Sequence, residues 1–370
     1  MQKIMKDELV DILRHRFERG ELGRRDVLMG LGLLGVTSLA FSPGPLMAQS
    51  KQLVLATWGG DTTKAIEEIL GNPFGEVSGL SVVSDTSGPS EGAVQVQASS
   101  GSISWDVMLL EYFSSITLGK KGLLGEIEYD IVDRDKVFGG QAHQWGVASH
   151  FNSYVMVYDA AHFGDNPPKT WADFFDVEKF PGKHTFPKWM MGILEAALLA
   201  DGVQPDGLYP LDLDRAFAKV EKLMPHVVSV WGTGAESQQL MLDGDAVMGM
   251  LWGTRAILVD RDSEQEVTFT FQDGFLAPDA WGYMKDNPAG AKAANEFIAF
   301  TQDPARQVEL LRLAGYGPAN PEASSLVPDD LKRIDCNQPE NRHLMHDLDM
   351  EWYSENYATA LDRFTALIAS

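Results

Sequence analysis

Short apolar runs alternate with amphipathic stretches along the chain after residue 50. Runs of four to eight residues that are rich in β-branched and aromatic side chains are typical of buried strands. Stretches with apolar residues every three or four positions are typical of helices that cover a sheet. The predicted strands are Gln52–Trp58, Leu80–Val83, Trp105–Leu110, Tyr154–Tyr158 and Ala246–Trp252. Helices are predicted after an Asp61-Thr62 cap, over Phe113–Lys121, from Thr170 onward, and over Leu211–Met224 and Ala289–Gln302.

This alternation of strands and helices predicts an α/β architecture with largely parallel sheets. The length of 370 residues favours two domains or lobes, because one domain typically takes about 150 residues. The chain has no internal repeat, no low-complexity tract and no Gly/Ser linker. We therefore expect the lobes to be joined by short crossing strands and not by a flexible tether.

The first 48 residues have the pattern of an export signal. Arg24 and Arg25 precede an uncharged run from Val27 to Phe41, which at 15 residues is too short to span a membrane. A basic region, a short apolar run and the small residue Ala48 predict a secretory signal peptide that is cleaved near Ala48. The paired arginines resemble a twin-arginine (Tat) signal, although the Sec route stays open. The mature protein is therefore predicted to be periplasmic.

Charge and cysteine usage exclude several classes of protein. The chain has 30 Lys and Arg against 53 Asp and Glu, a formal net charge of −23. A surface this acidic repels phosphate backbones, which argues against a nucleic-acid-binding protein. Cys336 is the only cysteine, so an intramolecular disulfide and a cysteine-rich metal site are excluded.

The motifs of common enzymes are missing from the sequence. It contains no G-x-S-x-G nucleophile elbow, no phosphate-binding P-loop and no H-E-x-x-H zinc motif. His343 and His346 are spaced to share a metal ion with Asp347 or Asp349, but a solvated polar helix explains the same pattern. A pair of carboxylates suited to glycoside hydrolysis stays open among the many acids, although no local pattern selects one.

Aromatic and acidic residues follow the ends of predicted strands. Trp58 precedes Gly59-Gly60, Trp252 precedes Gly253, and Glu111 follows the strand that ends at Leu110. Ligands of open α/β sheets bind beyond the carboxyl ends of the strands. Aromatic faces and carboxylates at those ends predict a cleft for an organic cation, bound through cation–π contacts and ion pairs.

Several stretches of the sequence have a recognisable order and spacing, although no single one is decisive. They are Thr170–Phe175, Lys179–Lys183, Glu221–Pro225, Leu242–Trp252, Gly315–Asn320 and Glu351–Tyr353. Through them, over about residues 52–365, the sequence resembles the extracytoplasmic solute-binding proteins of ABC importers, specifically the spermidine/putrescine-binding branch.

The resemblance implies the type II periplasmic-binding-protein fold, with two α/β lobes that close over a ligand between them. Lobe 1 would comprise residues 49–149 and 278–323, and lobe 2 residues 150–277 and 324–370. A monomeric, loaded protein would dock on an ABC permease in the inner membrane and release its ligand there. The resemblance implies no cofactor, no metal, no nucleic acid and no chemistry on the ligand.

Matching positions in the polyamine cleft supply the candidate ligand-binding residues. Trp58 matches the first aromatic lid, Trp252 the tryptophan of the second lobe, and Asp279 the amine-binding aspartate. Glu111, Phe113 and Tyr316 match further positions of the cleft, and Asp61 and Trp189 complete the candidate set.

The chain also departs from the polyamine pattern. Two acidic positions fall on Trp189 and Gly192, a hinge aromatic falls on Ala277, and a terminal polar contact falls on Tyr353. A buried ammonium without a partner is strongly unfavourable. We therefore expect a polyamine-like or other small nitrogenous solute, such as a monoamine or an amino-acid-like compound, with its amine held by Asp279.

Two other functions remain open from the sequence. A secreted hydrolase would need a base, nucleophile or metal cluster, and none is visible. A sensor that docks on a membrane receptor would use the same two lobes and cannot be distinguished from a transport protein by sequence.

Overall fold

The structure, a computed structural model, describes residues 51–369. The predicted leader, residues 1–48, lies outside the described residues. The strands are β1 (Gln52–Ala56), β2 (Ser81–Asp85), β3 (Val107–Glu111), β4 (Ala142–His143), β5 (Gly146–Asp159), β6 (His184–Pro187), β7 (Val227–Trp231), β8 (Met248–Trp252), β9 (Val267–Tyr283), β10 (Gly317–Pro318) and β11 (His346–Asp347).

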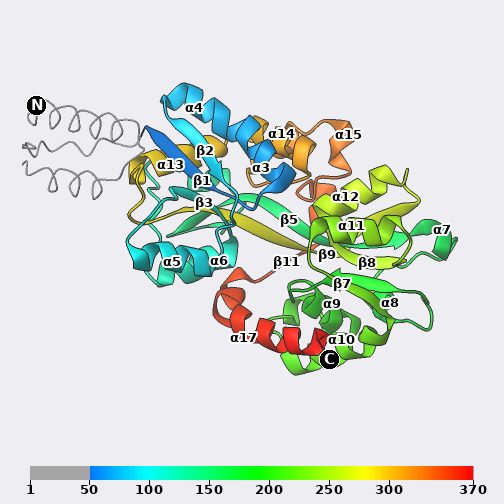
Figure 1. Cartoon of the computed structure of the whole chain (residues 1–370). Coiled ribbons are helices and arrows are strands. Elements are labelled where there is room, and N and C mark those ends of the chain that lie inside the picture. The colour runs from blue at the N-terminus through cyan, green and yellow to red at the C-terminus, as the bar shows by residue number, and fades with distance from the viewer. Residues whose placement is uncertain (1–50, 370) are drawn as a thin grey trace, which may run out of the picture. The chain divides into compact units, whose positions relative to one another are not determined.

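Within the described residues these eleven strands form one mixed sheet (Figure 1). Its main path runs β2-β1-β3-β9-β5-β8-β6-β7. Pairing is parallel among β2, β1 and β3 at one end and among β8, β6 and β7 at the other. The two long strands β5 and β9 run antiparallel to each other and to their outer neighbours. The α/β fold is thus confirmed, but the centre of the sheet is antiparallel and not parallel as expected.

Helices follow most of the strands and cover the sheet. They are α3 (Gly60–Ile66), α4 (Asn72–Ser78), α5 (Glu91–Ser100), α6 (Tyr112–Lys120), α7 (Ala160–Phe163), α8 (Trp171–Phe175), α9 (Ile193–Ala200), α10 (Leu213–Leu223), α11 (Gly234–Leu242), α12 (Gly253–Asp262), α13 (Ala291–Thr301), α14 (Pro304–Ala314), α15 (Asp329–Lys332), α16 (Pro339–Arg342) and α17 (Met350–Ile368). In Figure 1, α4 and α14 lie on one side of the β1–β3 end and α5 and α6 on the other. None of the helices within residues 51–369 is both long and apolar enough to cross a lipid bilayer.

Local sequence explains where the predicted elements begin and end. Thr170 caps α8 in a capping box with Asp173, whose side chain accepts the Thr170 backbone N–H. The α10 segment has apolar residues on one face only, and that face is buried against α9. The predicted strand Tyr154–Tyr158 is the second part of β5, which extends back to Gly146. The described core contains several fully buried large rings, among them Trp171, Trp231, Trp281 and Tyr353.

The crossing strands are long, contrary to the expectation of short ones. β5 has 14 residues and β9 has 17, and each takes part in both ends of the sheet. Their pairing register shifts twice, between Ala148 and His150 and between Tyr154 and Met156. Such irregularities bend a strand locally and increase its twist. The first shift falls at the predicted lobe boundary after residue 149, and the second lies further along β5, opposite Thr270–Phe275 of β9.

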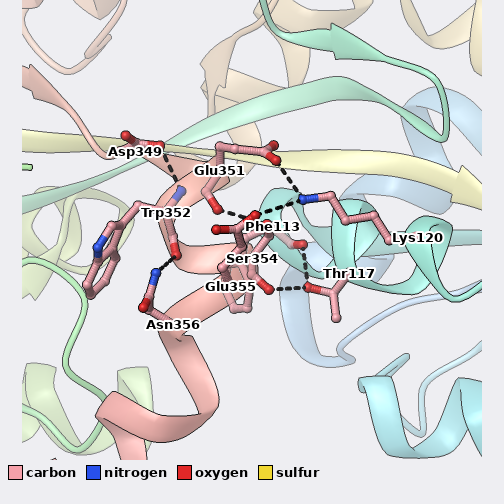
Figure 2. A network of polar contacts seen from close by, with 9 residues as sticks. All are labelled: Phe113, Thr117, Lys120, Asp349, Glu351, Trp352, Ser354, Glu355 and Asn356. Carbon is pink, nitrogen blue, oxygen red and sulfur yellow. Dashed lines mark hydrogen bonds and ion pairs between the residues drawn. The ribbon is translucent and has the colours of Figure 1, made fainter. Parts of the chain in front are cut away.

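The C-terminal helix α17 contacts helices from both ends of the sheet. Figure 2 shows its polar contacts with α6, which follows β3. Lys120 Nζ lies 2.6 Å from Glu351 Oε1 and 3.4 Å from Glu355 Oε1. Tyr353, two residues after Glu351 on α17, donates a hydrogen bond from its hydroxyl to Glu195 Oε1 of α9 at 2.5 Å. One short stretch of α17 therefore connects α6 with α9.

Candidate functional site

Two carboxylates meet where β3 ends beside β9. Glu111 and Asp279 are direct partners in the antiparallel pairing of these strands, and His150 of β5 pairs with Asp279 on its other side. Asp279 Oδ2 accepts a hydrogen bond from Asn152 Nδ2 at 2.8 Å and lies 3.0 Å from His150 Nε2. The Asp279 side chain is 18% exposed and that of His150 only 5%. Asp279 is thus held in place from behind while part of it remains open to solvent.

The carboxyl group of Glu111 is perturbed by its surroundings. The residue keeps some accessible surface, but its carboxyl group is packed among protein atoms. Burial, and then the negative charges of Asp279 and Glu91, raise the pKa of Glu111 to about 8. Strongly perturbed carboxyl groups that retain solvent access are typical of functional sites.

Tyr316 lies against this pair of carboxylates. Its ring is 3.8 Å from the His150 ring, at an interplanar angle of 39°. Its hydroxyl lies 2.7 Å from the hydroxyl of Thr62, at the start of α3. Burial raises the pKa of Tyr316 to about 12, and the charges of Asp279 and Arg255 act on it in opposite directions. Tyr316 therefore lies near both an acidic and a basic group.

Three tryptophans form a cluster beside β8. The rings of Trp189 and Trp252 stack with centroids 5.0 Å apart, and Trp231 presents an edge to both. Trp189 Nε1 donates to the hydroxyl of Tyr154, whose backbone pairs with Trp252. The charges of Glu111 and Asp279 both act on the Tyr154 hydroxyl, so this cluster adjoins the carboxylates. Trp231 is fully buried and was not predicted as a site residue.

Arg255 is a basic residue of the site that the sequence analysis missed. It occupies the first turn of α12, directly after β8, and its Nε atom is buried with no hydrogen-bond partner among residues 51–369. A Cβ at Gly234 would lie 2.4 Å from that Nε, so a larger residue there would displace the Arg255 side chain. A positive charge near the N-terminus of a helix opposes the helix dipole. The placement of Arg255 is therefore unfavourable for α12 itself, and this signal could have identified it.

Trp58 and Asp61 lie at the outer part of the site. Trp58 is 49% exposed, and its indole N–H donates to the carbonyl oxygen of Leu109 at 2.9 Å. Its ring packs over Gly88, where a Cβ would approach it to 3.1 Å. Asp61 is exposed and pairs with Lys64 at 2.9 Å. The hydrogen bond and charge of Lys64, with a smaller effect of Arg255, lower the pKa of Asp61.

The structure places Phe113 in the protein core, apart from the other predicted residues. Its side chain is 1% exposed and lies 4.5 Å from the ring of Tyr357 and 6.0 Å from that of Tyr353, both on α17. Tyr357 itself is near the carboxylates, because the charge of Glu111 acts on its hydroxyl. Phe113 thus supports α17 behind the site.

Metal ligands are not gathered at this site or elsewhere in the described range. Residues 51–369 contain no group of three or more His, Cys, Asp or Glu side chains placed to hold a metal ion. His346 Nε2 lies 3.4 Å from Asp273 Oδ1, and His343 Nδ1 lies 2.9 Å from the carbonyl oxygen of Pro339. Each histidine of this pair therefore has its own protein partner.

Comparison with known proteins gives consistent results. Residues 71–333 match the family model for a bacterial extracellular solute-binding protein. A γ-aminobutyric acid-binding protein of Pseudomonas aeruginosa is 30% identical over 342 residues, covering 91% of this chain and 96% of that protein.

Solved structures agree in fold. A GABA receptor structure has a TM-score of 0.80 and 32% identity, over 86% of this chain and 98% of that one. An ABC transporter substrate-binding protein from Bradyrhizobium japonicum also has a TM-score of 0.80, with 30% identity over 86% and 99% of the two chains. A spermidine/putrescine transporter substrate-binding protein from Streptococcus pneumoniae has a TM-score of 0.68 and 18% identity over 86% and 100%, which supports the shared fold alone. The chain therefore belongs to the bacterial extracellular solute-binding proteins, and its role is to bind a solute and not to catalyse a reaction.

Proposed function

We propose that the protein is the periplasmic component of an ABC importer and binds a small zwitterion, with an ammonium group at one end and a carboxylate at the other. The observation that carries this proposal is the pair of opposite charges beside Tyr316. Asp279 supplies the negative charge and Arg255, with its unpartnered Nε, supplies the positive one. An ω-amino acid such as γ-aminobutyrate has matching charges. The names of two relatives, a γ-aminobutyric acid-binding protein and a GABA receptor, support the same ligand class.

Asp279 is proposed to bind the ammonium group. Its carboxylate accepts a hydrogen bond from Asn152 and lies 3.0 Å from His150 Nε2, yet it is partly open, so a face remains available to a ligand. Ion pairs shielded from water are strong when their hydrogen bonds are complete. Glu111, its neighbour across the strands, adds a second carboxylate on the same side.

Arg255 is proposed to bind the carboxylate of the ligand. A guanidinium offers several N–H donors in a fixed plane and matches a carboxylate with two parallel hydrogen bonds. A buried donor without a partner is costly, so Arg255 gains from a ligand that completes its hydrogen bonds. This residue also argues against a polyamine, because a second ammonium group at this end would face a positive charge.

Trp189 and Trp252 are proposed to form an apolar wall along the ligand. Stacked indole rings present flat faces that attract a cation and pack well against a short methylene chain. Trp189 stands where polyamine binders carry an acidic residue. The chain is therefore suited to one ammonium group and not to two. Trp58, half exposed at the outer part of the site, is proposed to cover the bound ligand.

Delivery to a permease is proposed to follow from closure of the two predicted lobes, with bending at the irregular pairings of β5 and β9. The similar structure from Bradyrhizobium japonicum, an ABC transporter substrate-binding protein, supports this role. The predicted leader, whether a twin-arginine or a Sec signal, supports export to the periplasm. We propose that the exported protein acts as a monomer.

Calorimetric titration with matched ligands tests the two ends of the site. Wild-type protein should bind γ-aminobutyrate more tightly than butylamine, butyrate or putrescine. Arg255→Met and Asp279→Asn should each weaken binding of γ-aminobutyrate by about 2–5 kcal/mol, because each leaves one ligand charge unpaired. Arg261→Met, an exposed change on the same helix, is the control and should have little effect.

The monofunctional ligands distinguish the ends. The affinity for butylamine should be unchanged in Arg255→Met, and the affinity for butyrate should be unchanged in Asp279→Asn. Tighter binding of putrescine than of γ-aminobutyrate by wild type would contradict the zwitterion and favour a polyamine. Unchanged binding of γ-aminobutyrate by Arg255→Met would show that its carboxylate is bound elsewhere.

A further inference from the structure

Glu111 has a carboxylate as its nearest charged neighbour and no cation to balance it. It pairs with Asp279 across β3 and β9, so the two side chains project from adjacent positions on the same face. Within residues 51–369 no Lys, Arg or His forms an ion pair with Glu111, whereas Asp279 has both Asn152 and His150. Glu111 also makes no capping hydrogen bond at the start of α6.

The groups around Glu111 come from five elements. No cation among residues 51–369 forms an ion pair with Glu111 itself, although Lys121, directly after α6, lies 3.2 Å from Glu91. Asp279 on β9 and Glu91 at the start of α5 act on its carboxyl group as like charges. Tyr154 on β5 and Tyr357 on α17 face it as neutral hydroxyls, each with a raised pKa. The backbone of α6 begins at the next residue. His150 lies beyond Asp279, in contact with that carboxylate and not with Glu111.

Two carboxylates at directly paired positions on one face do not both ionise readily. Burial and the charge of Asp279 raise the pKa of Glu111 to about 8, so the empty site retains one proton at neutral pH. An ammonium group placed beside the pair reverses this balance, because an adjacent positive charge favours the ionised form of both acids.

We propose that an ammonium ligand displaces a proton from Glu111 when it binds, so that cation and proton compete for one site. In this exchange the O–H bond of the Glu111 carboxyl group breaks, the proton passes to solvent, and the new carboxylate accepts an N–H bond from the ligand. The ligand keeps all its protons, and no oxidant or reductant takes part. The inference rests on the proposed function, because it requires a ligand with a positive amine.

The exchange predicts the direction in which ligand affinity changes with pH. Below the pKa of Glu111 in the empty protein, a proton must leave before the ligand is fully bound, so affinity is lower in acid. Affinity should rise by up to about tenfold per pH unit toward pH 8 and level off above it. An alkylammonium group with a pKa near 10.4 and a carboxylate with a pKa near 4 do not change charge between pH 6 and 8.5. A pH dependence in this range therefore belongs to the protein.

Isothermal titration of γ-aminobutyrate into the full mature protein tests the exchange directly. At pH 6.5 the binding enthalpies in phosphate and Tris buffers should differ by the ionisation enthalpy of about one proton, and at pH 9 they should nearly agree. Glu111→Gln should release no proton and bind with nearly constant affinity from pH 6 to 8.5. Glu91→Gln, which removes the more remote carboxylate, is the matched control and should retain the proton release.

Each contrary outcome has a distinct meaning. Binding without proton release in wild type would overturn the exchange and leave the proposed function intact. Proton release that persists in Glu111→Gln would assign it to another group, with His150 the first to test, and would also overturn the inference. Failure of γ-aminobutyrate to bind at any pH would contradict the proposed ligand.

The empty protein provides a second test that needs no ligand. Since Glu111 holds its proton more tightly when folded than when unfolded, its contribution to stability is fully present below the unfolded pKa of about 4.5 and is lost as pH rises toward 8. Glu111→Gln should therefore have a higher melting temperature than wild type at pH 8 and the same one at pH 5. Equal melting temperatures at both pH values would overturn the inference even if no ligand were found.

Discussion

Trp252 shows how one side chain at a strand end serves both packing and binding. It is the last residue of β8 and is only partly buried, and its ring is fixed between Trp189 and Trp231. Rings fixed in this way lose little conformational entropy when a ligand packs on them. Its position after a buried strand, before Gly253, was visible in the sequence, whereas its two aromatic neighbours came from distant segments.

Replacing Trp252 separates the aromatic contribution from the apolar one. Trp252→Leu should weaken binding of a cationic ligand by about 0.5–2 kcal/mol, since a leucine keeps apolar contact but removes the electron-rich face. Trp252→Phe should weaken binding of the same ligand by a smaller amount, because phenylalanine retains an aromatic ring. Titration calorimetry on both variants measures the difference. Equal losses in the two variants would mean that Trp252 contributes by shape alone.

The predicted site residues differ in how far their positions could be inferred from sequence. Asp279, Glu111, Trp252 and Tyr316 lie together because strand ends and the long strand β9 meet at one place. Phe113 follows Glu111 closely, but helical geometry turns it toward α17. Arg255 was missed because its position against the helix dipole is a weak signal in the sequence, and its unpartnered Nε is visible only in the structure.

At the scale of elements, β9 was the main omission of the sequence analysis. Asp273, Gly274 and Pro278 interrupt its hydrophobic pattern, and these residues normally indicate turns. Gly274 is needed because a Cβ there would lie 3.1 Å from two backbone oxygens, those of Phe271 and Tyr154. Asp273 and Gly274 do interrupt the ladder, but pairing with β5 resumes at Phe275 and pairing with β3 begins at Asp279, so the segment stays one strand of the sheet. Strand pairing of this kind depends on residues distant in sequence, so it cannot be predicted from the local sequence of β9 alone.

The contact between α17 and α9 depends on a buried hydrogen bond that mutation can remove. Tyr353 and Glu195 are both fully buried, and burial raises the pKa of Glu195. Tyr353→Phe removes the hydroxyl that donates to Glu195 Oε1 and should lower the free energy of unfolding by about 1–3 kcal/mol. Urea denaturation monitored by circular dichroism measures the change.

A matched tyrosine provides the control for this variant. Tyr158 is half-buried on β5, and its hydroxyl has no hydrogen-bond partner within residues 51–369. Tyr158→Phe should therefore change the unfolding free energy by less than about 0.5 kcal/mol. Equal effects of the two substitutions would show that the Tyr353–Glu195 hydrogen bond adds nothing to the anchoring of α17.

For the whole molecule, the proposed lobes and the shared sheet set limits on how it can close. The sheet is continuous through β5 and β9, so closure must bend these two strands and cannot be a free rotation about a tether. α17 adds a further connection between the two ends of the sheet. Its residue Glu351 pairs with Lys120 of α6, and its residue Tyr353 donates a hydrogen bond to Glu195 of α9. We expect a small, well-defined hinge motion.

Small-angle X-ray scattering tests closure of the whole molecule. The radius of gyration of the mature protein should decrease when γ-aminobutyrate is added to saturation, and the Arg255→Met variant should show a smaller decrease at the same ligand concentration. Arg261→Met should behave like wild type. Identical scattering profiles with and without a ligand whose binding has been verified by calorimetry would contradict a closing motion.

The position of β9 in the sheet also has a consequence for the order in which the protein folds. β3 has β1 on one side and β9 on the other, yet β9 begins only at Val267 and α17 only at Met350. While a ribosome makes the first half of the chain, β3 has an unpaired edge and α6 lacks its partner helix. Contacts so distant in sequence slow folding and expose sheet edges to aggregation. The edge of β3 therefore stays unpaired until the β9 segment has been made.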